Sequence, residues 1–258
     1  MSNELLYEVK EHVAFLTINR EERRNALSQD MITAFLEYFN RIEQDEEVFA
    51  VCITGVGEKA FCSGADLTTT LGGNMKDTSS GARNYAELLK VMTRCEKPLV
   101  ARVNGPCLAG GIGVMLSCDI VIVRNDIFFC TPEVNVGVFP MMVGALLFRN
   151  VNRKKLMDMV LTGRKILAPE AENMGLITRS VEPNRLDDEV QKTLKIVTSK
   201  SPIGVRIGKE AFRAIDTMLF ERAVDYLCEA LGKVISTDDA KEGMMAFIEK
   251  REPTFKGR

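Results

Sequence analysis

The fold of this chain is decided by two short segments, Ala60-Phe61-Cys62-Ser63-Gly64-Ala65-Asp66-Leu67 and Asn104-Gly105-Pro106-Cys107-Leu108-Ala109-Gly110-Gly111-Ile112-Gly113. Each follows an apolar run that predicts a buried β-strand, and each is poor in bulky side chains. Glycine permits positive φ angles and a close approach of the backbone to a ligand. The second segment also opens a predicted helix, whose first amides lack internal partners and carry partial positive charge. Such a turn can bind an oxyanion or a phosphate, but tight packing of a helix on a strand would need the same glycines.

Neither segment matches a common nucleotide-binding or esterase motif. The second segment is not G-x-G-x-x-G, so a dinucleotide-binding fold is poorly supported. The first segment has Phe61 where a G-x-S-x-G nucleophile elbow needs its first glycine.

Strands and helices alternate on both sides of these segments in the first half of the chain. Ser28 is suited to cap a helix that carries Met31, Phe35, Phe39 and Ile42 on one face. Apolar runs flanked by helices are typical of parallel strands that are buried on both faces. The sequence therefore predicts an α/β fold with a largely parallel sheet. Its strands are expected at Leu5–Val9, Val13–Ile18, Val48–Thr54, Leu99–Val103 and Ile120–Val123.

The rest of the chain is predicted to contain one long loop and a helical C-terminal part. Residues Thr68–Gly81 are rich in glycine, serine and threonine, and they predict a loop that could close over a ligand before a helix through Tyr85 and Met92. No repeat or linker divides the chain, and we expect an α/β core over residues 1–195 and a helical region over residues 196–258. Helical spacing dominates after about residue 140, at Lys154–Leu161, Pro169–Met174, Leu186–Thr198, Val205–Ile215, Phe220–Ile235 and Ala240–Lys250.

Composition excludes several classes of protein. The 258 residues are 46% hydrophobic and 27% charged with a formal net charge of −2, which is typical of a globular protein and gives no reason to expect binding to nucleic acid or to an anionic membrane. No run of eighteen apolar residues predicts a membrane span, and the first residues do not resemble a secretory signal. The seven cysteines form no C-x-x-C pair, so we expect free thiols in a reducing cytoplasm and no metal site.

The single histidine narrows the chemistry. His12 precedes the apolar run that begins at Val13, where a surface turn between two strands is predicted. A Ser-His or Cys-His mechanism would have to use it. If His12 is a turn residue, acid–base chemistry must come from carboxylates, lysine, tyrosine or backbone groups.

Glu133 is the carboxylate that stands out. It lies just beyond a predicted strand, after Pro132, in the segment Phe129-Cys130-Thr131-Pro132-Glu133-Val134-Asn135-Val136-Gly137-Val138-Phe139-Pro140. A carboxylate among apolar neighbours tends to have a raised pKa, which suits proton transfer near neutral pH. The local sequence is equally compatible with a solvated loop acid or with a partner of Arg102 or Arg124.

The order and spacing of these three segments resemble the crotonase superfamily, also called the enoyl-CoA hydratase/isomerase family. The resemblance extends from Val13–Arg20 to Phe247-Ile248-Glu249-Lys250-Arg251, which is essentially the whole chain. Its most specific part is the pair Ser-Gly-Ala-Asp at 63–66 and Asn-Gly-x-x-x-Ala-Gly-Gly at 104–111. Further matches are Asn25-Ala26-Leu27, Cys118-Asp119-Ile120, Pro132-Glu133 and Leu161-Thr162-Gly163.

The resemblance implies a fold, a site and an assembly. The fold would be a spiral of ββα units with a helical C-terminal trimerisation region, assembled as a homotrimer or homohexamer. The backbone amides of Ala65 and Gly110 would form an oxyanion hole for the thioester oxygen of an acyl-CoA, and Glu133 would move protons. Coenzyme A would be part of the substrate, so no separate cofactor is implied. The residues implied to bind substrate are Ala65, Asp66, Leu67, Gly110, Gly113, Met141 and Lys250, the last reaching a neighbouring subunit's coenzyme A.

The sequence departs from the family hydratases in its carboxylates. Those enzymes use two glutamates, and the position of the first aligns with Gly113, which has no side chain and would leave a void for a larger acyl group or a water. One glutamate is the pattern of the enoyl-CoA isomerases, so we expect double-bond isomerisation in preference to hydration. Asp66 is expected to order its own loop, Met141 and Met142 to pack as core residues or line an acyl pocket, and Glu87 to act as a reserve carboxylate or stay solvated. The alternatives are thioester hydrolysis, decarboxylation, and a non-catalytic protein that binds coenzyme A.

Overall fold

A six-stranded sheet forms the centre of the computed structural model, which describes residues 3–66 and 75–258. The strand order is β1-β2-β3-β4-β6-β9, and only the β1–β2 pair is antiparallel. The expected parallel sheet is therefore present. Its first five strands lie within one or two residues of the expected positions, and β9 was not expected. Their bounds are β1 Leu5–Lys10, β2 Val13–Ile18, β3 Ala50–Gly55, β4 Leu99–Val103, β6 Ile120–Arg124 and β9 Arg179–Val181.

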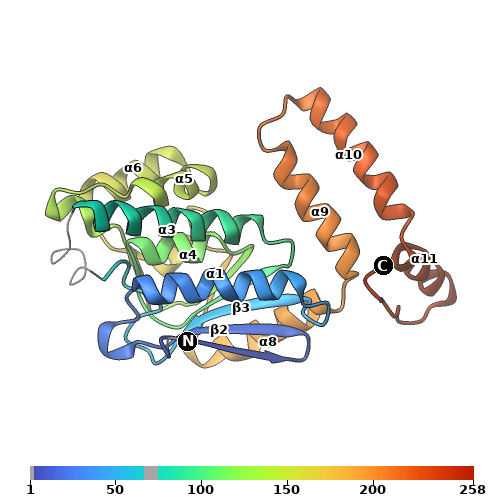
Figure 1. Cartoon of the computed structure of the whole chain (residues 1–258), viewed down its shortest axis with the longest axis horizontal. Helices are drawn as coiled ribbons and strands as arrows, with labels where there is room; N and C mark the ends of the chain where they lie inside the picture. The colour runs from blue at the N-terminus through green and yellow to red at the C-terminus, as the bar shows by residue number, and fades with distance from the viewer. Residues whose placement is uncertain (1–2, 67–74) are drawn as a thin grey trace.

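Helices cover both faces of this sheet (Figure 1). The helices α1 (Gln29–Gln44), α3 (Met75–Arg94) and α4 (Gly110–Leu116) lie on one face, and α8 (Leu186–Thr198) lies on the other. Alternate strand residues point to opposite faces, so Val51 and Ile53 pack with the first group and Cys52 packs with α8. Ser28 caps α1 by accepting a hydrogen bond from the amide of Met31, as the sequence predicted.

A second, smaller sheet was not predicted from the sequence. It consists of β5 (Cys107–Leu108), β7 (Phe128–Cys130) and β8 (Ile166–Leu167). Strands of two or three residues have no readable alternation, so the second glycine-rich segment has the sequence pattern of a simple turn. Together, β8 and β9 correct the expectation that the chain is almost wholly helical after residue 140.

The predicted loop at Thr68–Gly81 needs a correction. Helix α3 begins at Met75, so the last part of that segment is helical. Helix formation is cooperative, and a polar turn can extend a helix whose later residues are buried. Leu67 and residues 68–74 lie outside the described part of the chain, so the predictions made for them are not addressed by the structure.

The remaining elements of the core are short. The 3-10 turns η1 (Glu21–Arg23), η2 (Pro132–Val136) and η3 (Pro183–Arg185) connect longer elements. Helices α5 (Met141–Asn150), α6 (Arg153–Thr162) and α7 (Ala168–Asn173) follow the Pro-Glu segment. In the described residues, no helix is both long enough and apolar enough to span a bilayer.

The C-terminal helices extend away from the core (Figure 1). They are α9 (Pro202–Ile215), α10 (Phe220–Ile235) and α11 (Asp238–Glu249), and together they form the C-terminal arm. Lys209 on α9 holds the arm to the core by donating to Asp119 at 2.5 Å and to the carbonyl of Lys97 at 2.8 Å. The boundary drawn after residue 195 falls inside α8, and the division into two parts stays a prediction.

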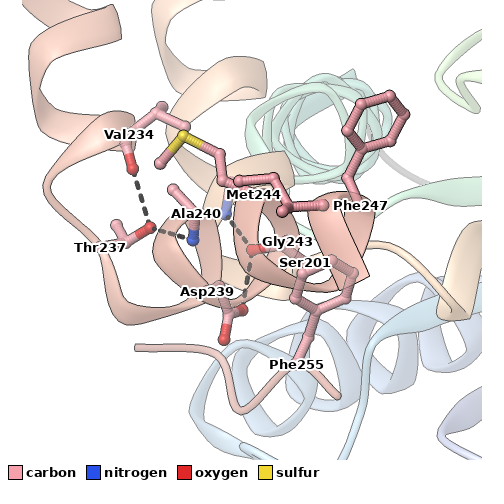
Figure 2. A pocket seen from close by; sticks show the side chains of 11 residues that line it. Ser201, Val234, Thr237, Asp239, Ala240, Gly243, Met244, Phe247 and Phe255 are labelled. Atoms are coloured by element: carbon pink, nitrogen blue, oxygen red, sulfur yellow. Dashed lines mark hydrogen bonds between the residues drawn. The ribbon is translucent and has the colours of Figure 1, made fainter. Parts of the chain in front are cut away.

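A buried carboxylate ties the chain end to this arm. Asp239 accepts hydrogen bonds from the Ser201 hydroxyl at 2.8 Å and from the amides of Lys256 and Gly257 at 2.7 and 3.0 Å. Figure 2 shows Ser201 and Asp239 beside a pocket whose wall includes Phe247 and Phe255. The residues that line this pocket come from the arm and the tail, and none of them is among the candidate catalytic residues.

Candidate active site

Hydrogen bonds place the two glycine-rich segments side by side. The amide of Phe61 donates to the carbonyl of Pro106 at 3.0 Å, and the amide of Leu108 donates to the carbonyl of Cys62 at 2.9 Å. A parallel bridge joins Cys62 to Cys107. Strand β5 pairs in turn with β7, which leads into the Pro-Glu segment. Three segments that are far apart in the sequence therefore converge at one place.

The amide of Ala65 is directed away from its own neighbouring strand. Leu27 donates to the carbonyl of Gly64 at 2.8 Å and accepts from the amide of Asp66 at 3.0 Å. In a parallel bridge of this kind, the residue between these two groups, Ala65, directs its own N–H to the other side. Among the hydrogen bonds of the described residues, none has the Ala65 amide as donor.

Gly64 brings this amide next to Gly110. Its φ of +92° is a backbone conformation that favours glycine. A Cβ built on Gly64 would lie 2.7 Å from the Cβ of Ala109 and 3.1 Å from the nitrogen of Gly110, so the two segments are in direct contact. Only a residue without a side chain allows this approach.

The amide of Gly110 opens helix α4. Ala109 has an unusual positive φ of 49° and donates its own amide to the carbonyl of Cys130 at 2.9 Å. The first amides of a helix have no acceptor in the preceding turn, and among the described residues none accepts from the Gly110 amide. Two amides without acceptors thus lie on segments in direct contact, and the oxyanion role that the resemblance implies for them stays a prediction.

Glu133 lies in the 3-10 turn η2, which begins with Pro132 and is followed by Gly137, a residue with a φ of 76°. Its Oε2 atom is buried and has no hydrogen-bond partner among the described residues. Burial raises the pKa of the Glu133 carboxyl above its ordinary value. A buried acceptor without a partner is costly, and a bound substrate or water would relieve that cost.

The two arginines that could have paired with Glu133 are engaged elsewhere. Arg102 pairs with Asp187 at 2.6 Å. Arg124 pairs with Glu58 at 3.0 Å and with Asp126 at 2.7 Å. The interpretation of Glu133 as the ion-pair partner of either arginine is therefore wrong.

The void expected beside Gly113 is not present. A Cβ built on Gly113 would lie 2.1 Å from the hydroxyl oxygen of Tyr85, which is inserted from α3. That hydroxyl donates to the carbonyl of Gly110 at 2.5 Å. The sequence indicated that Tyr85 lies on a core-facing helix, but helical spacing alone does not show which neighbour its hydroxyl meets.

Tyr85 is a neutral phenol in this environment. Only 8% of the residue is exposed. Burial raises its pKa well above the ordinary value, and the nearby Cys62, Cys107 and Glu133 raise it further. The hydroxyl can donate or accept a hydrogen bond there, but it does not supply a charge.

The other two candidate carboxylates form ion pairs away from the amide pair. Asp66 is 8% exposed and pairs with Arg20 at 3.0 Å, and Arg20 also contacts Glu4 at 2.8 Å and the carbonyl of Ala26 at 2.7 Å. This network fixes the loop that carries Ala65. Glu87 is half exposed on α3 and pairs with Lys90 at 3.0 Å.

The remaining candidates lie at the edges of the site or apart from it. Met141 and Met142 begin α5 with exposed fractions of 71% and 37%, so their interpretation as core residues is wrong. They continue an apolar rim formed by Val136, Val138 and Phe139 after Glu133. Lys250 ends α11 on the C-terminal arm, apart from the other candidates within one chain (Figure 1).

The cysteines and His12 lie in positions typical of structural residues. The seven cysteines are free, and six of them are buried. His12 lies in the turn after β1 and stacks on Phe49, where its ring contacts the carbonyl of Glu47 at 2.9 Å. In the described residues, no group of three histidine, cysteine or acidic side chains is placed to hold a metal ion.

The family model and the similar proteins agree on one protein family. The family model described as enoyl-CoA hydratase/isomerase matches residues 8–258. Similar proteins include the short-chain-enoyl-CoA hydratase of Clostridium acetobutylicum, 35% identical over 263 residues with 99% of each chain covered. The (E)-benzylidenesuccinyl-CoA hydratase of Thauera aromatica is 32% identical over 251 residues, covering 97% of this chain and 98% of the relative.

Solved structures confirm the fold. The enoyl-CoA hydratase of Bacillus anthracis superimposes with a TM-score of 0.96 at 29% identity, covering 99% of this chain and 100% of that one. The enoyl-CoA hydratase of Mycobacterium smegmatis gives 0.94 at 32% identity, covering 98% and 99%. The expected crotonase-like α/β architecture is thus shown over nearly the whole chain.

Proposed function

Because this chain belongs to the enoyl-CoA hydratase/isomerase family of enzymes, which act on acyl-CoA thioesters, we propose that it moves the double bond of an enoyl-CoA with Glu133 as its single acid–base residue. The observation that carries the proposal is that two amides without an acceptor and the buried, unpartnered Oε2 atom of Glu133 belong to segments joined by strand pairing.

The proposed reaction balances with this one carboxylate. The ionised Glu133 takes a proton from the α carbon of a 3-enoyl-CoA, and the electrons of that C–H bond move toward the thioester carbonyl. The oxygen becomes negative and is stabilised by the amides of Ala65 and Gly110. The neutral Glu133 then returns the proton to the γ carbon, which gives the conjugated 2-enoyl-CoA. One preorganised donor at such an oxygen typically contributes about 10²–10³ in rate.

The environment of Glu133 supports this role. Its raised pKa brings the carboxyl closer to neutral pH, where it can both accept and return a proton. Hydration through two carboxylates would need a second acid, and positions 66, 87 and 113 do not supply it. Gly113 has no side chain, and Asp66 and Glu87 are held in ion pairs.

Hydration is the second candidate, because the named relatives are hydratases. In that reaction Glu133 would take a proton from a water that adds to the β carbon, and it would then return a proton to the α carbon. Thioester hydrolysis, decarboxylation and binding of coenzyme A without turnover would each give a different product pattern, so the same assays distinguish them.

We also propose that the active form is a homotrimer or a homohexamer. The C-terminal arm exposes large apolar side chains to solvent in the single chain, including Phe220, Leu231, Phe247 and Ile248. Burying such a surface against another subunit is favourable. This assembly would also give Lys250 a route to a neighbouring subunit's coenzyme A, because α11 extends away from the core of its own chain.

Absorbance assays with 3-enoyl-CoA and 2-enoyl-CoA separate these functions. Isomerisation forms the conjugated thioester from 3-enoyl-CoA, whereas hydration removes the conjugated absorbance of 2-enoyl-CoA. We expect the first reaction to dominate and Glu133→Gln to lower it by about 10²–10⁴-fold. Glu87→Gln is the matched control, because its carboxylate is exposed and paired with Lys90.

Each outcome decides between the candidates. Dominant hydration would exclude the isomerase proposal in favour of the second candidate. Absence of turnover with retained coenzyme A binding would indicate a binding protein. A Glu133→Gln variant with the full wild-type rate would show that the base is a different residue.

A further inference from the structure

Tyr85 occupies the space that a side chain at position 113 would fill. A Cβ at Gly113 would lie 2.1 Å from the Tyr85 hydroxyl oxygen and 3.3 Å from its Cζ atom. A Cβ at Gly110 would lie 3.5 Å from the same two atoms. Residues 110 and 113 share one face of α4, so the phenol covers the first turn of this helix. The absence of a side chain at Gly113 is what admits it, because even a Cβ there would overlap the hydroxyl.

The hydroxyl also makes a specific contact with this turn. It donates to the carbonyl of Gly110 at 2.5 Å, in a region from which water is largely excluded. The phenol stays neutral because burial, by raising its pKa, disfavours its charged form. The phenol therefore keeps the proton that this hydrogen bond needs at neutral pH.

We propose that Tyr85 is a positioning residue of the acyl-CoA site, which substitutes for a side chain at position 113 and holds the first turn of α4 so that the Gly110 amide stays aimed at the thioester oxygen. This inference rests on the proposed function, because it assigns Tyr85 a role through the amide pair of Ala65 and Gly110. Tyr85 acts on the oxyanion through Gly110, and it exchanges no proton with the substrate.

The position of Tyr85 on α3 explains how the phenol itself is fixed. Its neighbours Leu88, Leu89 and Met92 are buried in the same core cluster as Ile112 and Met115 of α4. The ring is thus held by packing, and the hydroxyl transmits that rigidity to a glycine-rich turn. Glycines at 110, 111 and 113 give this turn little rigidity of their own.

Binding of acetoacetyl-CoA provides a test that does not depend on turnover. Stabilisation of its enolate by the amide pair produces a near-ultraviolet absorbance band, and unmodified coenzyme A serves as a ligand without an acyl oxygen. The variants to compare are Tyr85→Phe, Gly113→Ala and the double variant. The matched control is Tyr7→Phe, because the Tyr7 hydroxyl on edge strand β1 is buried without a hydrogen-bond partner among the described residues.

The expected result is a selective loss. Tyr85→Phe should weaken enolate binding by about two- to tenfold, the effect of one hydrogen bond, while coenzyme A affinity stays at the wild-type level. Tyr7→Phe should leave both unchanged. Gly113→Ala should lower enolate binding at least as much as Tyr85→Phe, because its methyl group displaces the phenol.

The double variant tests whether the two positions share one space. If both substitutions act by removing the same hydrogen bond, the double variant should bind the enolate about as well as Tyr85→Phe alone, within about a factor of two. The proposal would be overturned if the double variant lost enolate binding by the product of the two single losses. It would also be overturned if Tyr85→Phe showed the same enolate absorbance band as the wild type. A wild-type protein without any enolate band would overturn the proposed function and the role of Tyr85 with it, so the two failures are distinguishable.

Discussion

Gly64→Ala should uncouple the two segments of the site while leaving the chemical groups in place. Gly64 is buried, has a φ of +92°, and lies against Ala109 and Gly110. The substitution adds a single methyl group. It removes no hydrogen-bonding group and no charge, so any effect on catalysis must come through geometry.

The expected magnitude follows from two distances. The new Cβ would lie 2.7 Å from the Cβ of Ala109 and 3.1 Å from the nitrogen of Gly110. Carbon atoms in favourable contact are about 3.5–4.0 Å apart, so the segments must separate by roughly 1 Å. A displacement of that size at a reacting group can cost about 10²-fold in rate. The positive φ adds roughly 1–2 kcal/mol of strain and overpacking adds about 1–3 kcal/mol, so we expect the free energy of unfolding to fall by about 2–5 kcal/mol.

The assay combines steady-state kinetics with denaturant unfolding. We expect kcat to fall by at least about 10²-fold with a smaller change in KM, because in the proposed reaction the displaced amides bind the transition state more strongly than the ground state. Gly257→Ala is the matched control. Its φ is +75°, but its nearest contacts are at 3.8 and 3.9 Å on Pro202, so strain is introduced without a clash. A folded Gly64→Ala enzyme that kept more than about a tenth of the wild-type kcat would refute the reasoning.

Three further outcomes are expected. Burial raises the pKa of Glu133, so the wild type loses stability relative to Glu133→Gln as pH rises through that pKa. In calorimetry at a series of pH values, the variant should have a higher melting temperature than the wild type at neutral pH. Below about pH 4 the two melting temperatures should be equal. Arg20→Met deprives Asp66 of a buried ion pair and should lower the free energy of unfolding, measured by urea denaturation, by about 3 kcal/mol. Arg20→Lys should restore only part of that lost free energy. Asp239→Ala should speed hydrogen exchange of the C-terminal tail amides without affecting the sheet strands. Tail amides that exchange at the same rate in the variant and the wild type would show that Asp239 does not hold the tail.

The central sheet could be predicted from the sequence because its strands carry strong local signals. Leu99–Val103 and Val13–Ile18 were predicted at the bounds that the structure shows, since both are apolar runs bounded by turns. The small strands β5 and β8 have two residues each, and their pairing depends on contacts between distant segments. Such pairings leave no periodic pattern in the chain, so they were missed.

The candidate site was predictable where function constrains the backbone. Gly64 is required by close approach and by its positive φ, and such a requirement produces a recognisable motif in the sequence. Tyr85 could not be found in this way. Its position on a buried helix face is the ordinary position of a core residue, and the contact that distinguishes it is made only when α3 lies over α4.

Gly113, which stands where the family hydratases have a glutamate, is therefore interpreted differently once the fold is known. In the sequence it is the absence of a carboxylate, which implies an empty space and a simpler reaction. In the structure the space is filled from another helix by a neutral hydroxyl. The pKa of Glu133 is raised by the burial of its carboxyl, which is the largest cause acting on it. In the proposed reaction the pair Gly113 and Tyr85 thus leaves Glu133 as the one proton-transfer group, and a carboxylate at 113 could be introduced only with removal of the phenol.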